Sequence, residues 1–254
     1  MKLTVLGCSG GIGSGRHTTC FLLDDDILID AGTGITRLSL EQLAGIDHIF
    51  LTHSHLDHVL GLPLLLDAVG DRRGKPVVVH ALPETLEILS EHLFNWKLWP
   101  DFREIPDVSN PWVTFSPLPL GSSVNLDSRI FTTLPAHHVV PACGYRITWE
   151  SGSLVFTGDT TSSDALMHAL NDMSDLHDLI IETSFENALR DIAVASQHHW
   201  PDSLAHELQR LKRQPRIWIT HLKPGNEDAI VAELRRLIPG REIQPLVQEQ
   251  IIEW

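Results

Sequence analysis

The chain has 254 residues, a hydrophobic fraction of 43% and a formal net charge of −14 at pH 7. This length allows a substantial buried core, and the acidic balance argues against a long nucleic acid as partner because counterion release requires a basic surface. No apolar run approaches the ~20 residues that span a bilayer, so we expect a single domain over 1–254 that does not enter membranes. The three cysteines lack Cys-x-x-Cys spacing, which indicates neither a disulfide framework nor a thiolate zinc site.

The first 30 residues predict strands separated by polar turns. A strand over 3–6 runs directly into a glycine-rich loop at 7–15, a pattern unlike a signal peptide, and we therefore expect a cytoplasmic protein. The loop lacks the Gly-Lys-Ser/Thr of a Walker motif, so it is either a flexible turn near a ligand or a tight structural turn. A hairpin is predicted from strands at 18–23 and 26–29. Asp30 follows it, either as a carboxylate that orients metal ligands or as a simple turn cap.

After a short predicted helix at 39–44, four potential metal ligands follow an apolar strand. The strand over 49–52 continues into His53, and its period of two would place His53 and His55 on the same side, where two imidazoles can share one ion. Asp57 and His58 precede a buried helix that has a proline in its first turn, and they can face a second ion. Imidazole and carboxylate donors suit zinc, with manganese or iron as alternatives. The structural alternative is a surface cluster of histidines.

The middle of the chain predicts a strand at 76–80 and a helix at 83–94, followed by the longest irregular segment. This aromatic and proline-rich insertion spans about 94–120. Its aromatic side chains can stack on a base or sugar, pack the loop onto its own domain, or contact a partner in a homodimer.

The second half repeats one theme, an apolar run that ends in a titratable residue. Such runs end at Asp159, Glu182 and His221, as the earlier one ends at His53. Helices predicted at about 164–171 and 201–212 lie between them, and a helix predicted at about 227–237 follows the last. Strands that alternate with helices indicate an α/β fold, in which functional side chains gather outside the carboxyl ends of the strands.

These residues together resemble the metallo-β-lactamase superfamily, whose His-x-His-x-Asp-His motif corresponds to 53–58. The resemblance covers nearly the whole chain and implies a four-layer αββα sandwich with a dinuclear metal site, most often of zinc. It implies that Asp159 bridges the two ions and that His221 is the last ligand. Of the adjacent His137 and His138, the resemblance favours His138, which stands six residues before Gly144 as in the family form. The implied metal ligands are His53, His55, His138, Asp57, His58, Asp159 and His221.

Within the superfamily, further motifs are similar to those of class II 3′,5′-cyclic-nucleotide phosphodiesterases. The similar elements are Phe94-Asn95 with Trp99-Pro100, Ile181-Glu182-Thr183-Ser184-Phe185, and His198-His199-Trp200-Pro201 followed by Leu204 and Glu207-Leu208. The chain departs from the signature at Pro63 and Leu66, and Trp200 stands in place of a threonine.

The resemblance implies hydrolysis of cyclic AMP or cyclic GMP to the 5′-nucleoside monophosphate, by attack of a metal-bound hydroxide on phosphorus. His198, supported by Glu182, would protonate the O3′ leaving group, and Asp57 is both a ligand and a catalytic carboxylate. His198 could instead be a surface helix cap, with His199 as the next candidate for the acid. Two other functions remain open: a tRNA 3′-processing endonuclease or other phosphodiester hydrolase of the same superfamily, and a metal-binding protein with a vestigial site.

Overall fold

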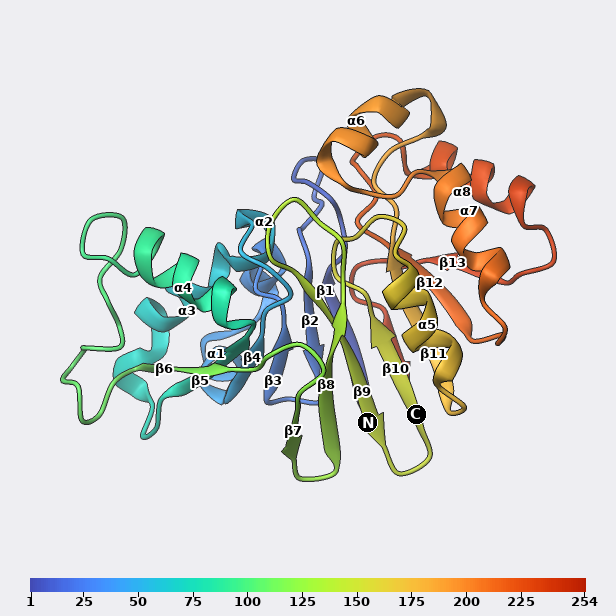
Figure 1. Ribbon diagram of the computed structural model, residues 1–254. Helices are drawn as coiled ribbons and strands as arrows, with labels where there is room; N and C mark the ends of the chain where they lie inside the picture. Colours follow the sequence, from blue (N-terminus) through green and yellow to red (C-terminus); the bar gives the residue numbers. More distant parts are fainter. The chain divides into compact units, whose positions relative to one another are not determined.

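The computed structural model describes all 254 residues and divides them into two compact units (Figure 1). Unit 1 comprises 1–8, 15–118 and 247–254, and unit 2 comprises 9–14 and 119–246. Each unit has one mixed seven-stranded sheet and its own cluster of buried apolar side chains. The predicted α/β class is confirmed.

The sheet of unit 1 has the strand order β14-β1-β2-β3-β4-β5-β6. The predicted hairpin is confirmed: β2 and β3 pair antiparallel, and the turn contains Asp24 in the left-handed region with φ 50°. From β3 to β6 the strands pair in parallel. The strands are β1 (Lys2–Gly7), β2 (Cys20–Leu23), β3 (Ile27–Ile29), β4 (His48–Phe50), β5 (Val77–Ala81), β6 (Val113–Pro117) and β14 (Ile251–Glu253).

Helices of unit 1 pack their apolar side chains onto its sheet. Leu62 and Leu66 of α3 share a buried cluster with Ile49 of β4 and Val79 of β5. Local sequence starts two of these helices, because Ser39 forms a capping box before α1 and α4 begins at a proline. The helices are α1 (Leu40–Gly45), α2 (Leu56–Val59), α3 (Gly61–Val69) and α4 (Pro83–His92), with short 3₁₀ turns η1 (Thr33–Arg37) and η2 (Gly70–Arg72).

The aromatic insertion is less irregular than predicted. Its end forms β6, which pairs with β5 at the edge of the sheet, where a terminal proline is tolerated. Phe94 and Phe102 are buried, and Trp99 and Trp112 pack against the same core. The segment therefore packs largely onto its own unit, although Trp96 is 59% exposed. The homodimer stays a prediction.

The sheet of unit 2 has the order β13-β12-β11-β10-β9-β8-β7. Strands β7 to β10 pair antiparallel, whereas β10 to β13 pair in parallel. The carboxyl ends of β10, β11 and β12 consequently meet at one edge, as the apolar runs predicted. The strands are β7 (Ser123–Leu126), β8 (Arg129–Pro135), β9 (Cys143–Trp149), β10 (Gly152–Phe156), β11 (Leu176–Glu182), β12 (Arg216–Thr220) and β13 (Ile243–Pro245).

Three predicted helices of unit 2 are confirmed, and a fourth was not foreseen. Leu170 of α5, Leu208 of α7 and Leu234 of α8 are completely buried in one cluster with Leu179 and Ile219 of the sheet. The unforeseen helix, α6, carries one buried residue, Ala193, so its apolar pattern is weak. The helices are α5 (Asp164–Asp172), α6 (Arg190–Ser196), α7 (Pro201–Arg210) and α8 (Glu227–Leu237), with a 3₁₀ turn η3 (Asn187–Leu189). None of the chain's helices combines the length and the apolar character needed to cross a bilayer.

Candidate functional site

The histidine motif of unit 1 follows β4, but not as an extended strand. Strand β4 ends at Phe50, so the prediction that the strand continues to His53 is wrong. His53 and His55 lie in the loop before α2, and their rings still meet edge to face, with centroids 4.7 Å apart. Asp57 and His58 lie within α2, where Nε2 of His58 is 3.9 Å from Oδ2 of Asp57.

Asp30 holds this motif in place. Its carboxylate accepts the Thr52 backbone N–H and the Thr52 hydroxyl, each at 2.8 Å, and lies 2.7 Å from Nδ1 of His58. Because the Thr52 hydroxyl donates to Asp30, its oxygen accepts from Nδ1 of His53 at 3.0 Å. Both imidazoles therefore carry their hydrogen on Nδ1, and Nε2 carries the lone pair that a metal ion needs. Asp30 is thus the orienting carboxylate, rather than only a turn cap.

Burial disfavours the ionised form of the Asp30 carboxyl. The carboxyl is completely buried, which raises its pKa, while the adjacent His58 imidazole and the hydrogen bonds from Thr52 oppose that rise. Asp30 also has φ 55°, a left-handed conformation that aspartate and asparagine tolerate better than most residues. The sharp turn after β3 aims the carboxylate at His58.

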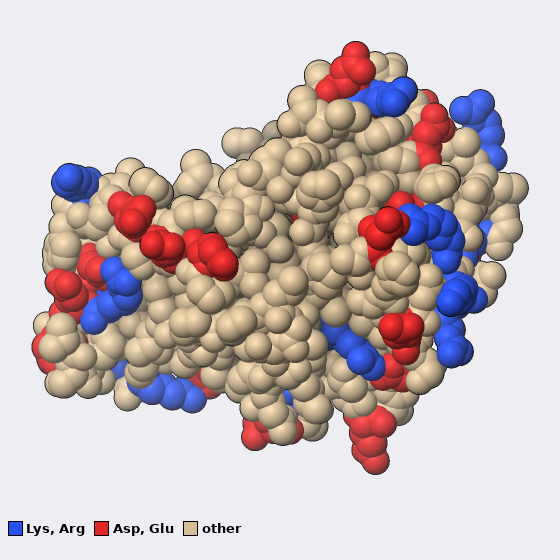
Figure 2. Space-filling model, in the orientation of Figure 1, with Lys and Arg blue, Asp and Glu red and all other residues tan.

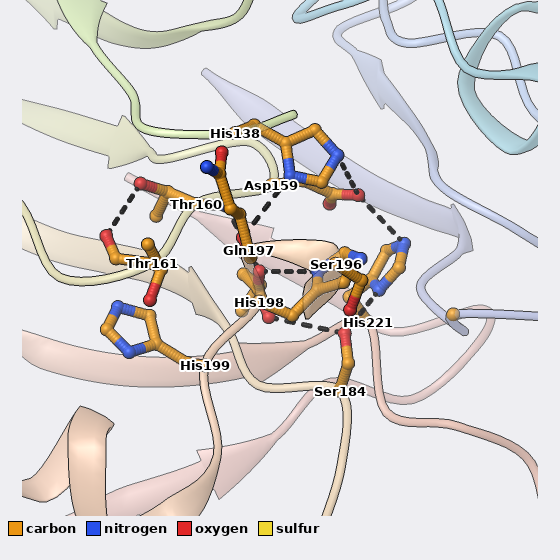
Figure 3. A network of polar contacts seen from close by, with 12 residues as sticks. His138, Asp159, Thr160, Thr161, Ser184, Ser196, Gln197, His198, His199 and His221 are labelled. Atoms are coloured by element: carbon orange, nitrogen blue, oxygen red, sulfur yellow. Dashed lines mark hydrogen bonds and ion pairs between the residues drawn. The ribbon is translucent and has the colours of Figure 1, made fainter. Parts of the chain in front are cut away.

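In unit 2 three potential ligands converge after separate strands (Figure 3). Asp159 follows β10, His221 follows β12 with φ 63°, and His138 lies in the loop after β8. Oδ2 of Asp159 is 3.3 Å from Nε2 of His221 and 4.0 Å from Nε2 of His138. The predicted convergence of Asp159 and His221 at the carboxyl ends of the strands is therefore observed.

The two adjacent histidines of the third motif are placed differently. The side chain of His138 is 1% exposed, and its Nδ1 is 3.3 Å from the carbonyl oxygen of Gln197, so its Nε2 faces Asp159. His137 is exposed, and its backbone bonds to Thr160 and Thr161. This placement supports His138 as the ligand.

Glu182, at the end of β11, organises the rest of the site. Its Oε1 accepts the Thr160 backbone N–H at 3.0 Å and lies 2.7 Å from Nδ1 of His198. Its Oε2 accepts the Ser184 hydroxyl at 3.3 Å, so the Ser184 oxygen accepts from Nδ1 of His221 at 2.9 Å. Ligand-type atoms of Asp159, Glu182 and His198 lie within 4.8 Å of one another. Glu182 therefore orients both His198 and His221.

His198 and His199 differ in environment and charge. Burial lowers the pKa of His198, but the charge and hydrogen bond of Glu182 and the charge of Asp159 outweigh this effect, so the pKa of His198 lies above its usual value. Burial lowers the pKa of His199 to about 4, and its Nδ1 lies 2.9 Å from the Ser203 hydroxyl of α7. Figure 3 shows His199 on the side of Thr161, away from Asp159. His199 is therefore a neutral, buried imidazole that anchors the start of α7.

Several supporting groups went unrecognised in the sequence. Thr52 and Ser184 each connect a carboxylate to a ligand-type histidine, and the glycine-rich loop supports His221. Ser184 lies two residues after Glu182, within the motif at 181–185. Sequence spacing alone does not show which way its hydroxyl points. Gly10 bonds to the chain just after His221, because its N–H donates to the Leu222 carbonyl and its own carbonyl accepts from the Lys223 ammonium. The Gly10 end of the loop is therefore structural.

The donor set of each unit fits a transition-metal ion. Unit 1 offers three imidazoles and a carboxylate, and unit 2 offers two imidazoles and a carboxylate. Nδ1 of His53, His58, His138 and His221 faces an oxygen in each case, the arrangement in which Nε2 binds the metal. Mixed nitrogen and oxygen donors suit zinc, manganese or iron better than calcium or magnesium.

Comparison with known proteins identifies the family. A model of the beta-lactamase superfamily domain matches residues 25–222. The chain belongs to this superfamily. It is 28% identical to a ribonuclease Z of Bradyrhizobium diazoefficiens (95% of this chain, 96% of the relative). It is 24% identical to a probable 3′,5′-cyclic-nucleotide phosphodiesterase of Yersinia pestis (93% of this chain, 82% of the relative).

The fold agrees with a solved member of the superfamily. The metallo-β-lactamase fold protein YhfI of Bacillus subtilis superposes with a TM-score of 0.79 at 18% identity, covering 100% of this chain and 98% of that one. The prediction of an α/β fold of the metallo-β-lactamase type is confirmed. The chain is accordingly a metal-dependent hydrolase of this superfamily.

Proposed function

We propose that this hydrolase is a phosphodiesterase that converts 3′,5′-cyclic nucleotides, cyclic AMP or cyclic GMP, into 5′-nucleoside monophosphates. The observation that carries the proposal is the Glu182–His198 pair, whose 2.7 Å contact lies beside Asp159. A pair of this kind can protonate a poor leaving group such as a ribose 3′-oxygen. The names of both curated relatives denote enzymes that cleave phosphodiester bonds.

We assign the metal ligands of both units to two divalent ions, on the family resemblance and the donor chemistry of each unit. His53, His55 and His138 would hold one ion, Asp57, His58 and His221 the other, and Asp159 would contact both. Such ions, when bound, supply an activated water and stabilise negative charge on a phosphoryl group. Zinc fits this donor set, and manganese or iron are alternatives.

The chain's own residues divide the remaining work. Glu182 accepts the Nδ1 hydrogen of His198 and so fixes the ring, which leaves Nε2 to carry the proton to the leaving oxygen. The rings of His138 and His221 flank His198, with centroids 4.9 and 5.1 Å away. This placement keeps the proton donor next to the proposed ligands while His198 stays 7% exposed.

A ribonuclease Z-like activity on precursor tRNA is the second candidate, because a curated relative of that name aligns over 95% of this chain. The net charge of −14 argues against it. On the face drawn in Figure 2, Lys and Arg side chains lie beside Asp and Glu. A long polyanion would require a continuous basic surface.

A substrate screen on metal-loaded protein separates the two activities. We expect turnover of cyclic AMP or cyclic GMP and of bis-p-nitrophenyl phosphate, and little cleavage of precursor tRNA. Cleavage of precursor tRNA without turnover of either cyclic nucleotide would establish the ribonuclease Z-like activity instead. Loss of all turnover on chelation is expected in either case.

The role of His198 has its own test. A ribose alkoxide needs a proton to leave, whereas p-nitrophenolate does not, so His198→Ala should lower kcat on cyclic AMP by roughly 10²–10⁴-fold and largely spare bis-p-nitrophenyl phosphate. Metal content should stay unchanged. His168→Ala, at an exposed histidine of α5, is the matched control. Equal loss on both substrates, or loss of metal, would make His198 a ligand or a structural residue.

A further inference from the structure

Unit 2 contains a surface pocket of about 340 Å³ at the start of α7. Its lining residues are Ser162, Arg190, Trp200, Asp202, Ser203 and His206. Neither the metal ligands nor the proposed acid and its carboxylate line this pocket, so the function assigned above leaves it unexplained.

Trp200 and Arg190 form a flat wall of this pocket. The Arg190 guanidinium carbon lies over the indole of Trp200, 5.7 Å from the ring centroid, as in a cation–π contact. The Trp200 backbone N–H donates to the Ser203 hydroxyl at 3.0 Å, and the next residue, Pro201, is buried. The indole is only partly buried although its backbone is held on both sides. Exposed, fixed rings and guanidinium planes are the surfaces on which nucleobases stack.

The pocket lies within the reach of a nucleotide from the catalytic pair. Trp200 follows His198 by two residues, a backbone span of at most about 7 Å, and Ser162 follows Asp159 by three. Backbone hydrogen bonds hold both segments, from Thr161 to His137 and from Ser184 to His199. The backbone of Trp200 therefore lies no more than about 7 Å from that of His198, a distance that the sugar and base of a nucleotide can span.

The charges of the pocket suit a base better than a second phosphate. The pocket lining carries one cation, Arg190, and one carboxylate, Asp202. Two hydrogen bonds with Asn187, at 3.0 and 3.1 Å, set the position of Asp202. An ionised carboxylate only accepts hydrogen bonds, so it repels phosphate and favours the N–H groups on the edge of a base. Ser162 adds a hydroxyl that can donate or accept.

We propose that this pocket binds the base of the nucleotide substrate, with Trp200 and Arg190 as the stacking surface and Asp202 as the acceptor for base N–H groups. The inference rests on the proposed phosphodiesterase function and adds a residue that determines specificity. The phosphodiesterase signature that this chain resembles has threonine at the position of Trp200. The proposed metal ligands and the proposed proton donor, His198, keep the roles given above.

Binding of the product separates this inference from the proposed function. Adenosine 5′-monophosphate and ribose 5-phosphate share a phosphate and a sugar, and only the first has a base. Calorimetric titration of the metal-loaded protein should show Trp200→Ala weakening adenosine 5′-monophosphate roughly 10- to 100-fold, with ribose 5-phosphate unchanged. Trp200→Phe, which keeps an aromatic face, should restore much of the affinity. Trp149→Ala, at a partly exposed tryptophan elsewhere in unit 2, should have no effect.

Kinetics provide the second readout. Trp200→Ala should raise KM for the cyclic nucleotide by a similar factor while kcat and the turnover of bis-p-nitrophenyl phosphate, which has no base, stay unchanged. Arg190→Gln should have a smaller effect in the same direction. Equal losses on both ligands, or a Trp200→Ala variant with unaltered affinity for adenosine 5′-monophosphate, would overturn the inference. Trp200-dependent binding in a protein that hydrolyses no cyclic nucleotide would uphold the base site and refute the proposed function.

Discussion

The two units use the same hydrogen-bonding device for different purposes. In unit 1 the buried Asp30 binds His58 directly and reaches His53 through the Thr52 hydroxyl. In unit 2 the buried Glu182 binds His198 directly and reaches His221 through the Ser184 hydroxyl. Each device fixes two imidazoles with Nδ1 as the donor, so that Nε2 is available for chemistry.

The difference lies in what the directly bound histidine faces. His58 is completely buried, and its Nε2 is 3.9 Å from Oδ2 of Asp57, whereas His198 keeps 7% exposure. A histidine whose Nε2 faces a second carboxylate is suited to metal binding. A histidine that keeps some exposure beside the proposed metal ligands is suited to proton transfer. We therefore predict that neutralising Glu182 mainly lowers activity, whereas neutralising Asp30 mainly lowers metal affinity.

Neutralising Glu182 should give the largest loss of activity. Glu182→Gln removes the charge that keeps His198 protonated and oriented, so kcat on cyclic AMP should fall by roughly 10²–10⁴-fold. Among the proposed ligands Glu182 reaches only His221, and it does so through the Ser184 hydroxyl, so metal content measured by elemental analysis should fall less than in Asp30→Asn. Glu150→Gln, at an exposed glutamate of the same unit, is the control. If Glu182→Gln loses as much metal as Asp30→Asn, the proposed difference between the two units is wrong.

Neutralising Asp30 should instead weaken metal binding. In the Asp30→Asn variant the new side chain tolerates the left-handed backbone, but its amide cannot replace both acceptor oxygens, so metal affinity should fall about 10–100-fold. Competition with a chromogenic chelator measures this affinity. At saturating metal, kcat should recover more in Asp30→Asn than in Glu182→Gln. The control is Asp25→Asn, at a side chain that is 90% exposed, which should behave as the wild type. Unchanged metal affinity in Asp30→Asn would contradict the proposed role of the Asp30 carboxylate.

The glycine-rich loop offers a way to disturb His221 without touching Glu182. A Cβ at Gly10 would lie 2.8 Å from Nδ1 of His221 and would also clash with its carbonyl oxygen. Gly10→Ala should therefore displace the ring, cost about 1–3 kcal/mol of unfolding free energy and weaken metal binding. Thermal unfolding and chelator competition provide the measurements. Gly74→Ala, where a Cβ meets nothing within 4 Å, is the control, and equal behaviour of the two variants would refute the loop's role.

The last prediction concerns stability alone, at a buried histidine that pairs with an imidazole instead of a carboxylate. His80 of unit 1 lies 3.0 Å from His48, and burial followed by the charge of His48 lowers the pKa of His80 to about 4. Between pH 6.5 and 4, His80 binds a proton in the unfolded chain but not in the folded chain. The free energy of unfolding therefore falls as the pH falls through this range.

The His80→Gln variant should show a shallower dependence of stability on pH. The difference in slope should reach up to about 1.4 kcal/mol of unfolding free energy per pH unit within this window, measured by urea denaturation. Above about pH 7 the two slopes should agree. Parallel curves between pH 6.5 and 4 would show that His80 titrates normally in the folded protein.

The regular elements were largely predictable because each has a local cause. The hairpin at Asp24 and the helices that begin at Ser39 and Pro83 follow from turn, capping and proline chemistry. The failures occur where tertiary contacts override the local pattern. The stretch after Phe50 leaves the sheet because the Asp30 carboxylate binds the Thr52 backbone, and the end of the proline-rich insertion pairs with β5.

The sequence by itself determined the identity of the donors. The motif at 53–58 and the apolar runs that end at Asp159, Glu182 and His221 predicted imidazole and carboxylate groups at the ends of strands, because strand geometry and donor chemistry are local properties. Only the tertiary structure decided how each imidazole is oriented and which of two adjacent histidines faces Asp159. Those choices depend on Asp30, Ser184 and the Gln197 carbonyl, which lie 28 to 59 residues from the histidines that they hold. A hydrogen bond over such a separation is fixed by packing, and no local pattern encodes it.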